Sequence, residues 1–127
     1  MRTRPKKHFT PQNNWVNDPN GLIFHGGYYH LYFQHNPLEN KWGHMSWGHA
    51  RSKDLINWEE LPVAINEQPE NMIFSGSAVF DQDNNRIAAF YTSHKESNQY
   101  SNNFEVFLPK QGIQICLLVR NTFVKTD

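Results

Sequence analysis

Short aromatic and β-branched segments, separated by turn signals, constrain the fold of this chain more than any other feature. The turn signal His25-Gly26-Gly27 lies between two such segments and predicts a hairpin. No stretch shows a sustained helical period, so the predicted fold class is all-β. The predicted strands cover residues 22–24, 28–34, 45–51, 56–61, 73–80 and 86–93.

The spacing of these strands narrows the architecture. Four strands followed by a fresh set roughly forty residues later fit a β-propeller, in which a four-stranded blade takes about 40–45 residues. A β-sandwich is the alternative. Because a propeller closes with at least about four blades, a chain of 127 residues holds only an incomplete ring. We expect about one and a half to two blades.

The pattern of apolar and polar residues changes near residue 98. Residues 113–119 form an apolar patch without clear alternation, which we assign to no blade, and the polar end is typical of unstructured sequence. We therefore divide the chain into residues 1–97, the N-terminal part of a propeller, and residues 98–127, a divergent tail. Truncation or a shifted reading frame would produce such a tail.

Charge and composition disfavour several classes of partner. Twelve Lys and Arg residues balance twelve Asp and Glu residues, so we expect neither nucleic acid nor a membrane as a partner. No apolar run reaches the roughly 18 residues of a membrane helix, and residues 1–7 lead into polar sequence instead of a signal peptide. The chain as written is typical of a cytoplasmic protein, with a secreted parent as the alternative.

Metal and disulfide chemistry find little support. The single cysteine, Cys116, excludes an internal disulfide, and the seven histidines contain no H-x-x-x-H pair. We expect no metal and no cofactor.

The segment "WVNDPNG" at residues 15–21 admits two interpretations. Asp18, Pro19, Asn20 and Gly21 have the residue types of a type I β-turn. A plain turn leaves Trp15 and the flanking amides of Asn17 and Asn20 unexplained. Aromatic residues cluster with Asn, Gln and His between residues 15 and 58, which suits either a sugar-binding cleft or a β-rich core.

Four ordered motifs carry a family resemblance over residues 8 to about 97. "WVNDPNG" (15–21), "YFQHNP" (32–37), "WGHMSWGHARSKDLINW" (42–58) and "FSGSAV" (74–79) resemble the start of glycoside hydrolase family 32, which comprises invertases, levanases, exo-inulinases and sucrose-6-phosphate hydrolases. The resemblance implies a five-bladed propeller. It also implies retaining hydrolysis of terminal β-D-fructofuranosyl residues from sucrose or fructans, without a cofactor.

The resemblance assigns roles where residues match. Asp18 matches the catalytic nucleophile, mounted on the turn, and the other matched residues are implied sugar contacts or their close neighbours. Trp47 and Trp58 are interpreted as core. The implied substrate-binding residues are Asn17, Asn20, Gln34, Trp42, Phe74 and Ser75.

Half of the family's catalytic apparatus has no match. A retaining glycosidase needs a second, protonated carboxylic acid about 5–5.5 Å from the nucleophile. The family's acid/base lies in a Glu-Cys motif and a third acid lies in an Arg-Asp-Pro motif; neither occurs here. Glu59 and Glu60 are expected on a solvated face. The alternative function is therefore a non-catalytic remnant or a weak carbohydrate-binding fragment.

Overall fold

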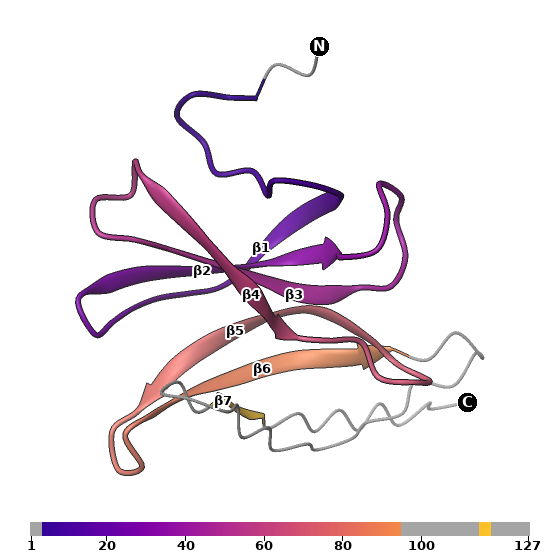
Figure 1. The fold of residues 1–127 in the computed structure, drawn as a ribbon. Helices are drawn as coiled ribbons and strands as arrows, with labels where there is room; N and C mark the ends of the chain where they lie inside the picture. The colour runs from indigo at the N-terminus through magenta and orange to yellow at the C-terminus, as the bar shows by residue number, and fades with distance from the viewer. Residues whose placement is uncertain (1–3, 95–114, 118–127) are drawn as a thin grey trace, which may run out of the picture.

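The computed structural model describes residues 4–94 and 115–117, which form two β-sheets (Figure 1). No helix long and apolar enough to cross a membrane occurs in the described part of the chain. The strands are β1 (Trp15–His25), β2 (Tyr28–Asn36), β3 (Ser46–Ser52), β4 (Trp58–Ile65), β5 (Met72–Asp81), β6 (Arg86–His94) and β7 (Ile115–Leu117).

The first sheet is an antiparallel meander in the order β1-β2-β3-β4. The predicted hairpin is confirmed, because β1 and β2 meet at Gly26 and Gly27, whose φ angles are +60° and +80°. Two residues with positive φ make the tight turn whose twist matches that of paired strands. A four-stranded meander is the expected unit of one propeller blade.

The prediction of a β-turn at residues 18–21 is wrong. Strand β1 runs without a break from Trp15 to His25, and its pairing with β2 shifts register between Val16 and Pro19 and again between Asn20 and Ile23. β1 lies at the end of the sheet order, where a proline costs no ladder bond and a bulge is tolerated. Pairing with β2 therefore overrides the local turn preference and begins the strand seven residues earlier than predicted.

The second sheet has the order β5-β6-β7. β5 and β6 pair in antiparallel fashion, whereas β7 pairs with β6 in parallel. Part of the apolar patch at 113–119 thus joins this sheet, although the sequence assigned it to none. The rest of the proposed tail, and its origin, lie outside the described residues.

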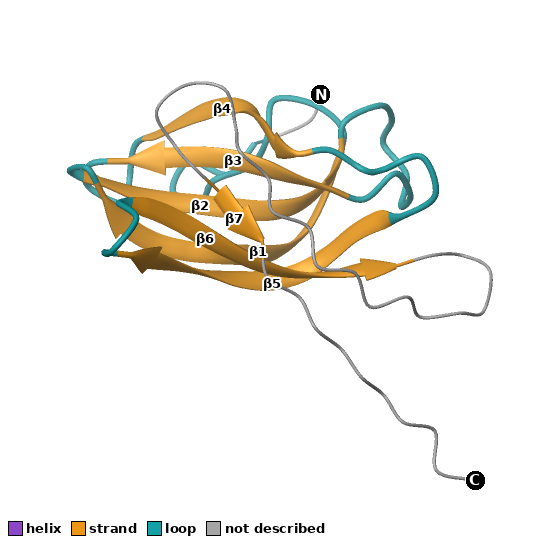
Figure 2. Ribbon diagram, turned by 90° about the horizontal axis from the view of Figure 1, so that it is seen from below, coloured by secondary structure: helices purple, strands orange, loops and turns teal. Residues whose placement is uncertain are grey.

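The core lies between the two sheets, where β1 and β5 run side by side (Figure 2). Its buried residues are Tyr32, Trp47, Ile65, Ile73, Ala89 and Tyr91. Gly21 is required here, because its φ is +51° and a Cβ atom would lie 2.8 Å from Tyr32 Cδ2. The glycine that resembled a turn residue therefore lets β1 approach the core.

Backbone groups of β5 join the two sheets. The indole N–H of Trp47 donates to the Phe74 carbonyl at 2.9 Å, and the Ile73 N–H donates to the Met45 carbonyl at 2.8 Å. We call this junction the seam. Near it the start of β5 meets the start of β1, where Ser75 bonds to Asp18.

Candidate active site

A pocket of about 300 Å³ opens where the seam reaches the start of β1. Six of the seven site residues predicted from the sequence line it, although they come from four separate segments of the chain. They are Asn17, Asp18, Gln34, Trp42, Phe74 and Ser75; Met45 and Thr92 complete the described lining. We call this the first pocket.

Asp18 is held from the neighbouring sheet. The hydroxyl of Ser75 donates to Asp18 Oδ2 at 2.8 Å, across 57 positions of sequence. Both side chains are exposed. A hydroxyl donor fixes the orientation of the carboxylate that accepts from it. The carboxylate is therefore open to a ligand on one side and anchored on the other.

Aromatic rings form one wall of the first pocket. The rings of Trp42 and Phe74 meet edge to face, with centroids 6.2 Å apart. Trp42 is 54% exposed, whereas Trp47 is fully buried. The predicted core position of Trp47 is confirmed, and the predicted contact of Trp42 with a sugar stays a prediction. Trp42 lies in the loop before β3, so strand alternation does not explain it.

The prediction that Trp58 belongs to the core is wrong. Its ring packs against Phe9 at 6.0 Å, away from the core cluster, and it is only partly buried. Its indole N–H donates to the Leu55 carbonyl at 3.3 Å. Trp58 therefore anchors the N-terminal segment and the loop before β4.

Asn20 and Gln34 occupy a chain of internal hydrogen bonds. Asn20 Nδ2 donates to Gln34 Oε1 at 2.8 Å, and Gln34 Nε2 donates to the Ile73 carbonyl at 2.9 Å. Asn20 Oδ1 accepts from the Gly76 N–H at 3.3 Å. Each amide side chain is 2% exposed. These contacts tie β1 and β2 to β5, so the two amides shape the pocket from beneath.

Asn17 retains a donor for a ligand. Its Oδ1 accepts from the Trp15 indole N–H at 2.8 Å, which orients the side-chain amide so that Nδ2 is the remaining polar group. The sequence missed Met45 and Thr92 as lining residues. Thr92 follows the buried Tyr91 on β6, and strand alternation could have placed it on the pocket side.

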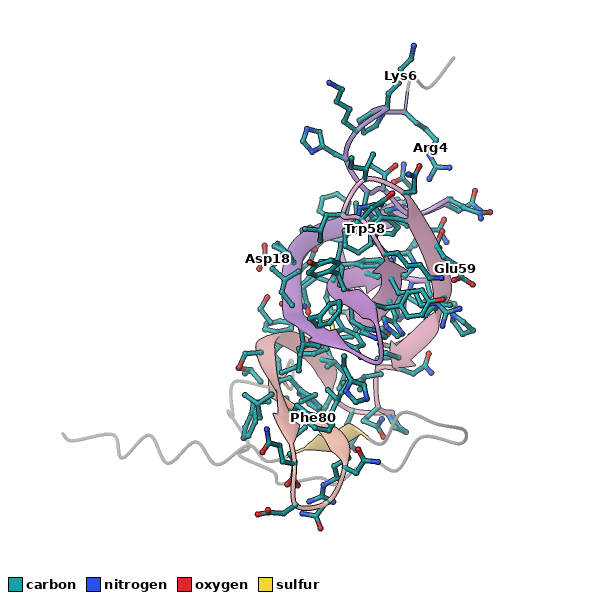
Figure 3. The ribbon with its side chains drawn as sticks, turned by 90° about the vertical axis from the view of Figure 1, so that its left-hand side faces the viewer. Arg4, Lys6, Asp18, Trp58, Glu59 and Phe80 are labelled. Atoms are coloured by element: carbon teal, nitrogen blue, oxygen red, sulfur yellow. The ribbon has the colours of Figure 1, made fainter. Side chains whose placement is uncertain are left out.

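Asp18 is the only carboxylic acid among the described residues that line the first pocket. Glu59 and Glu60 bond elsewhere, to Arg51 at 2.7 Å and to the Gln12 N–H at 2.8 Å. Asp18 and Glu59 project from opposite sides of the first sheet in Figure 3. Within residues 4–94, no cluster of three His, Cys, Asp or Glu side chains is arranged to hold a metal ion.

Comparison with known proteins gives a consistent result. Residues 8–124 match the glycosyl hydrolases family 32 N-terminal domain. The chain is 48% identical over 105 residues to the levanase of Bacillus subtilis, covering 76% of this chain and 16% of that protein. It is 49% identical over 105 residues to an extracellular exo-inulinase of Aspergillus niger, covering 72% of this chain and 20% of that protein.

A solved structure resembles the described fold. The β-fructofuranosidase of Schwanniomyces occidentalis, complexed with fructosyl-erythritol, aligns with a TM-score of 0.70 and 42% identity, over 76% of this chain and 22% of that chain. The present chain therefore spans about a fifth or less of the length of the levanase and the exo-inulinase.

Proposed function

The chain belongs to glycosyl hydrolase family 32, and from this premise we propose that it carries the nucleophilic half of a retaining β-fructosidase site. The fold is part of the family's all-β propeller. The proposed substrates are sucrose and the fructans levan and inulin, from which a terminal β-D-fructofuranosyl residue is released. Residues 1–97 are proposed to be the N-terminal part of the catalytic propeller.

The proposed reaction proceeds in two displacements. An Asp18 carboxylate oxygen bonds to the anomeric carbon of the fructosyl ring while the bond from that carbon to the leaving oxygen breaks. A protonated acid gives its proton to the leaving oxygen. Water then attacks the anomeric carbon and gives a proton to the group that acted as the acid; the bond from that carbon to Asp18 breaks, the Asp18 carboxylate is restored, and fructose leaves with retained configuration.

The first pocket supports this role because it presents a single oriented carboxylate beside an aromatic wall. Ser75 binds Oδ2 of Asp18, so the other carboxylate oxygen is the one we assign to attack. Trp42 and Phe74 offer apolar faces to a sugar ring, and Asn17 Nδ2 is assigned to a ring hydroxyl. Asn20 and Gln34 are proposed as positioning residues, since their amides bond within the protein.

One observation carries the proposal: the hydrogen bond from Ser75 to Asp18 brings the first and fourth family motifs together at a pocket. A fructosyl fluoride tests it directly, because fluoride leaves without needing a proton and the reaction requires only the nucleophile. We expect mass spectrometry of the purified chain to find one fructosyl unit esterified to Asp18. The adduct should accumulate, since no second carboxylic acid lines the described pocket to activate water.

Two variants control this experiment. Asp18→Asn should abolish the adduct, whereas Glu59→Gln, on the opposite side of the sheet, should leave it unchanged. Labelling of another side chain, or labelling that persists in Asp18→Asn, would contradict the assigned nucleophile.

Sugar binding without turnover is a second candidate function. It is favoured by the single carboxylic acid in the described lining of the first pocket, because a nucleophile without an acid cannot complete the double displacement. A reducing-sugar assay on the purified chain with sucrose and levan discriminates the two. Fructose release would establish hydrolysis, and binding without release would favour the second candidate.

A further inference from the structure

The loop at residues 37–44, between β2 and β3, carries Trp42 but contains no buried side chain that would hold it in place. Every residue of this loop is exposed or only partly buried, and even Leu38 is 67% exposed. The ring contact of Trp42 with Phe74 is its one aromatic contact. Since a loop that is ordered only when a ligand arrives loses conformational entropy on binding, the position of Trp42 depends on what holds the loop.

The side chain of Asn36 holds the near part of this loop. Asn36 is the last residue of β2 and is fully buried. Its Oδ1 accepts from the N–H groups of Leu38 at 3.0 Å and Glu39 at 3.3 Å. Its Nδ2 donates to the carbonyl of Lys41 at 2.8 Å. One buried amide therefore fixes both the first turn of the loop and the residue directly before Trp42.

The far part of the loop is held at the surface. Gly43 follows Trp42 with a φ of +143°, a conformation that favours glycine. His44 Nδ1 then pairs with Glu67 Oε1 at 2.7 Å, and both of these side chains are partly exposed. Trp42 thus stands between two attachments of the loop, and Asn36 provides the buried one.

The same loop is also attached to the start of β1. The Glu39 carbonyl accepts from the Trp15 N–H at 3.3 Å. The indole N–H of Trp15 in turn donates to Asn17 Oδ1 at 2.8 Å, which leaves Asn17 Nδ2 for a ligand. Because Asn36 fixes Glu39, the amide of Asn36 supports both Trp42 and Asn17.

We propose that Asn36 is a positioning residue that sets the places of two sugar-contacting residues, Trp42 and Asn17. The inference rests on the proposed function, because the fructosyl ring is the ligand assigned to the first pocket. It adds a residue that does not line that pocket. Asp18 is anchored separately, by Ser75 on β5. The amide of Asn36 should therefore govern the affinity for the sugar and not bond formation at the nucleophile.

The rate of labelling at increasing concentrations of fructosyl fluoride tests this separation. The fructosylation of Asp18 is followed by mass spectrometry, which gives a half-saturating concentration and a maximal rate. Asn36→Ala should raise the half-saturating concentration about tenfold, because the sugar must then order the loop. The maximal rate should change by less than about twofold, since the bond from Ser75 to Asp18 is retained.

Ser52 offers a matched control. It is the last residue of β3, is 2% exposed, and lies at the opposite end of the first sheet from Asn36 (Figure 1). Its Oγ accepts from the N–H groups of Asp54 at 3.2 Å and Leu55 at 2.8 Å, as Asn36 Oδ1 does in its own loop. Ser52→Ala should leave the half-saturating concentration and the maximal rate unchanged.

The indole N–H signals of the 15N-labelled chain provide a readout that needs no reaction. The chain has four tryptophans, and Trp42→Phe and Trp58→Phe identify two of their signals. Asn36→Ala should shift the Trp42 signal and leave the Trp58 signal in place. Ser52→Ala should do the reverse, because the Trp58 indole donates to the carbonyl of Leu55 in the loop that Ser52 holds.

Asn36→Asp is the second variant, in case Asn36→Ala does not fold. It keeps the size of the side chain and the oxygen that accepts from Leu38 and Glu39, but it replaces the donor to Lys41 with an acceptor. It should shift the Trp42 signal and raise the half-saturating concentration in the same direction as Asn36→Ala.

The outcomes separate the two proposals. If the chain is labelled at Asp18 but folded Asn36 variants keep its half-saturating concentration, Asn36 is not a positioning residue and the proposed function stands. An equal rise in Ser52→Ala would assign the effect to lost stability and would also overturn the inference. If the unaltered chain forms no adduct, the proposed function fails, and the Trp42 signal alone decides whether Asn36 fixes the loop.

Discussion

The two sheets differ in the kinds of side chain that they bury. Every buried polar residue of the described chain lies in the first sheet: Asn20, His30, Gln34, His35, Asn36, Ser46, His49 and Ser52. In β5 and β6 the buried residues are Met72, Ile73, Ile87, Ala88, Ala89 and Tyr91. The first sheet adds buried side-chain hydrogen bonds, which need specific partners, to its share of the apolar core, whereas the buried side chains of β5 and β6 contribute apolar packing. The site lies where one arrangement meets the other.

The largest expected effect comes from removing the side chain of Trp47, which contacts both sheets. Trp47 is fully buried in the core and also donates to the Phe74 carbonyl. Trp47→Ala should lower the free energy of unfolding by about 4 kcal/mol, through a cavity and an unpaired carbonyl. Urea denaturation measures this loss. Trp58→Ala, at a partly buried position, should cost about 1–2 kcal/mol; equal losses would mean that the seam is not special.

A second variant tests backbone contact within the second sheet. A Cβ atom on Gly76 would lie 1.7 Å from the Phe90 carbonyl oxygen, so Gly76→Ala must separate β5 from β6. We expect a loss of about 3 kcal/mol in the same denaturation experiment. Gly26→Ala is the control, because open space surrounds that residue and only its positive φ resists substitution; its cost should be about 1 kcal/mol.

Acid should weaken the first sheet selectively. His30 Nδ1 and His49 Nε2 lie 2.9 Å apart, an arrangement in which one ring must accept and so stay neutral. Burial, with the nearby charges of His30 and Arg51, lowers the pKa of His49 to about 3. Burial likewise lowers the pKa of His30, and a backbone bond to His25 partly opposes this.

The sign of the pH effect follows from these directions. The unfolded chain binds protons at these histidines near pH 6.5 and the folded chain does not, so stability falls as the pH drops below 6.5 toward 3. We expect a loss of about 2 kcal/mol between pH 6 and pH 4.5. Thermal unfolding of His49→Gln should show a shallower dependence over this interval, and an unchanged slope would contradict the assignment.

The smallest expected effect concerns the hydrogen bond by which Ser75, on the second sheet, holds the proposed nucleophile Asp18. Ser75→Ala removes the donor to Asp18 and should slow fructosylation of that residue by about tenfold, the equivalent of one hydrogen bond to a charged group. Ser75→Thr keeps the hydroxyl and should retain most of the rate. Equal slowing by both substitutions would assign the effect to packing.

Strand positions were predictable from the sequence because aromatic and β-branched residues mark strands locally. The start of β1 was not, since Asp18-Pro19-Asn20-Gly21 has turn chemistry and only its pairing with β2 makes it a strand. Within the site, the motifs were enough to name residues that meet: Asp18, Trp42 and Phe74 line one pocket.

Burial of the site's polar side chains could not be predicted from the sequence. Asn20 and Gln34 are buried because β5 packs against β1, a contact between segments far apart in the chain.

The seam is built asymmetrically, and this has a consequence for sequence variation. Two of its hydrogen bonds run from the side chains of Gln34 and Trp47 to the main-chain carbonyls of Ile73 and Phe74, and a third joins the Ile73 N–H to the Met45 carbonyl. Exchange of an amino acid can delete a side-chain donor, but every amino acid at 73 or 74 still supplies a carbonyl. Saturation libraries scored for folding alone should therefore tolerate more substitutions at positions 73 and 74 than at the two donor positions.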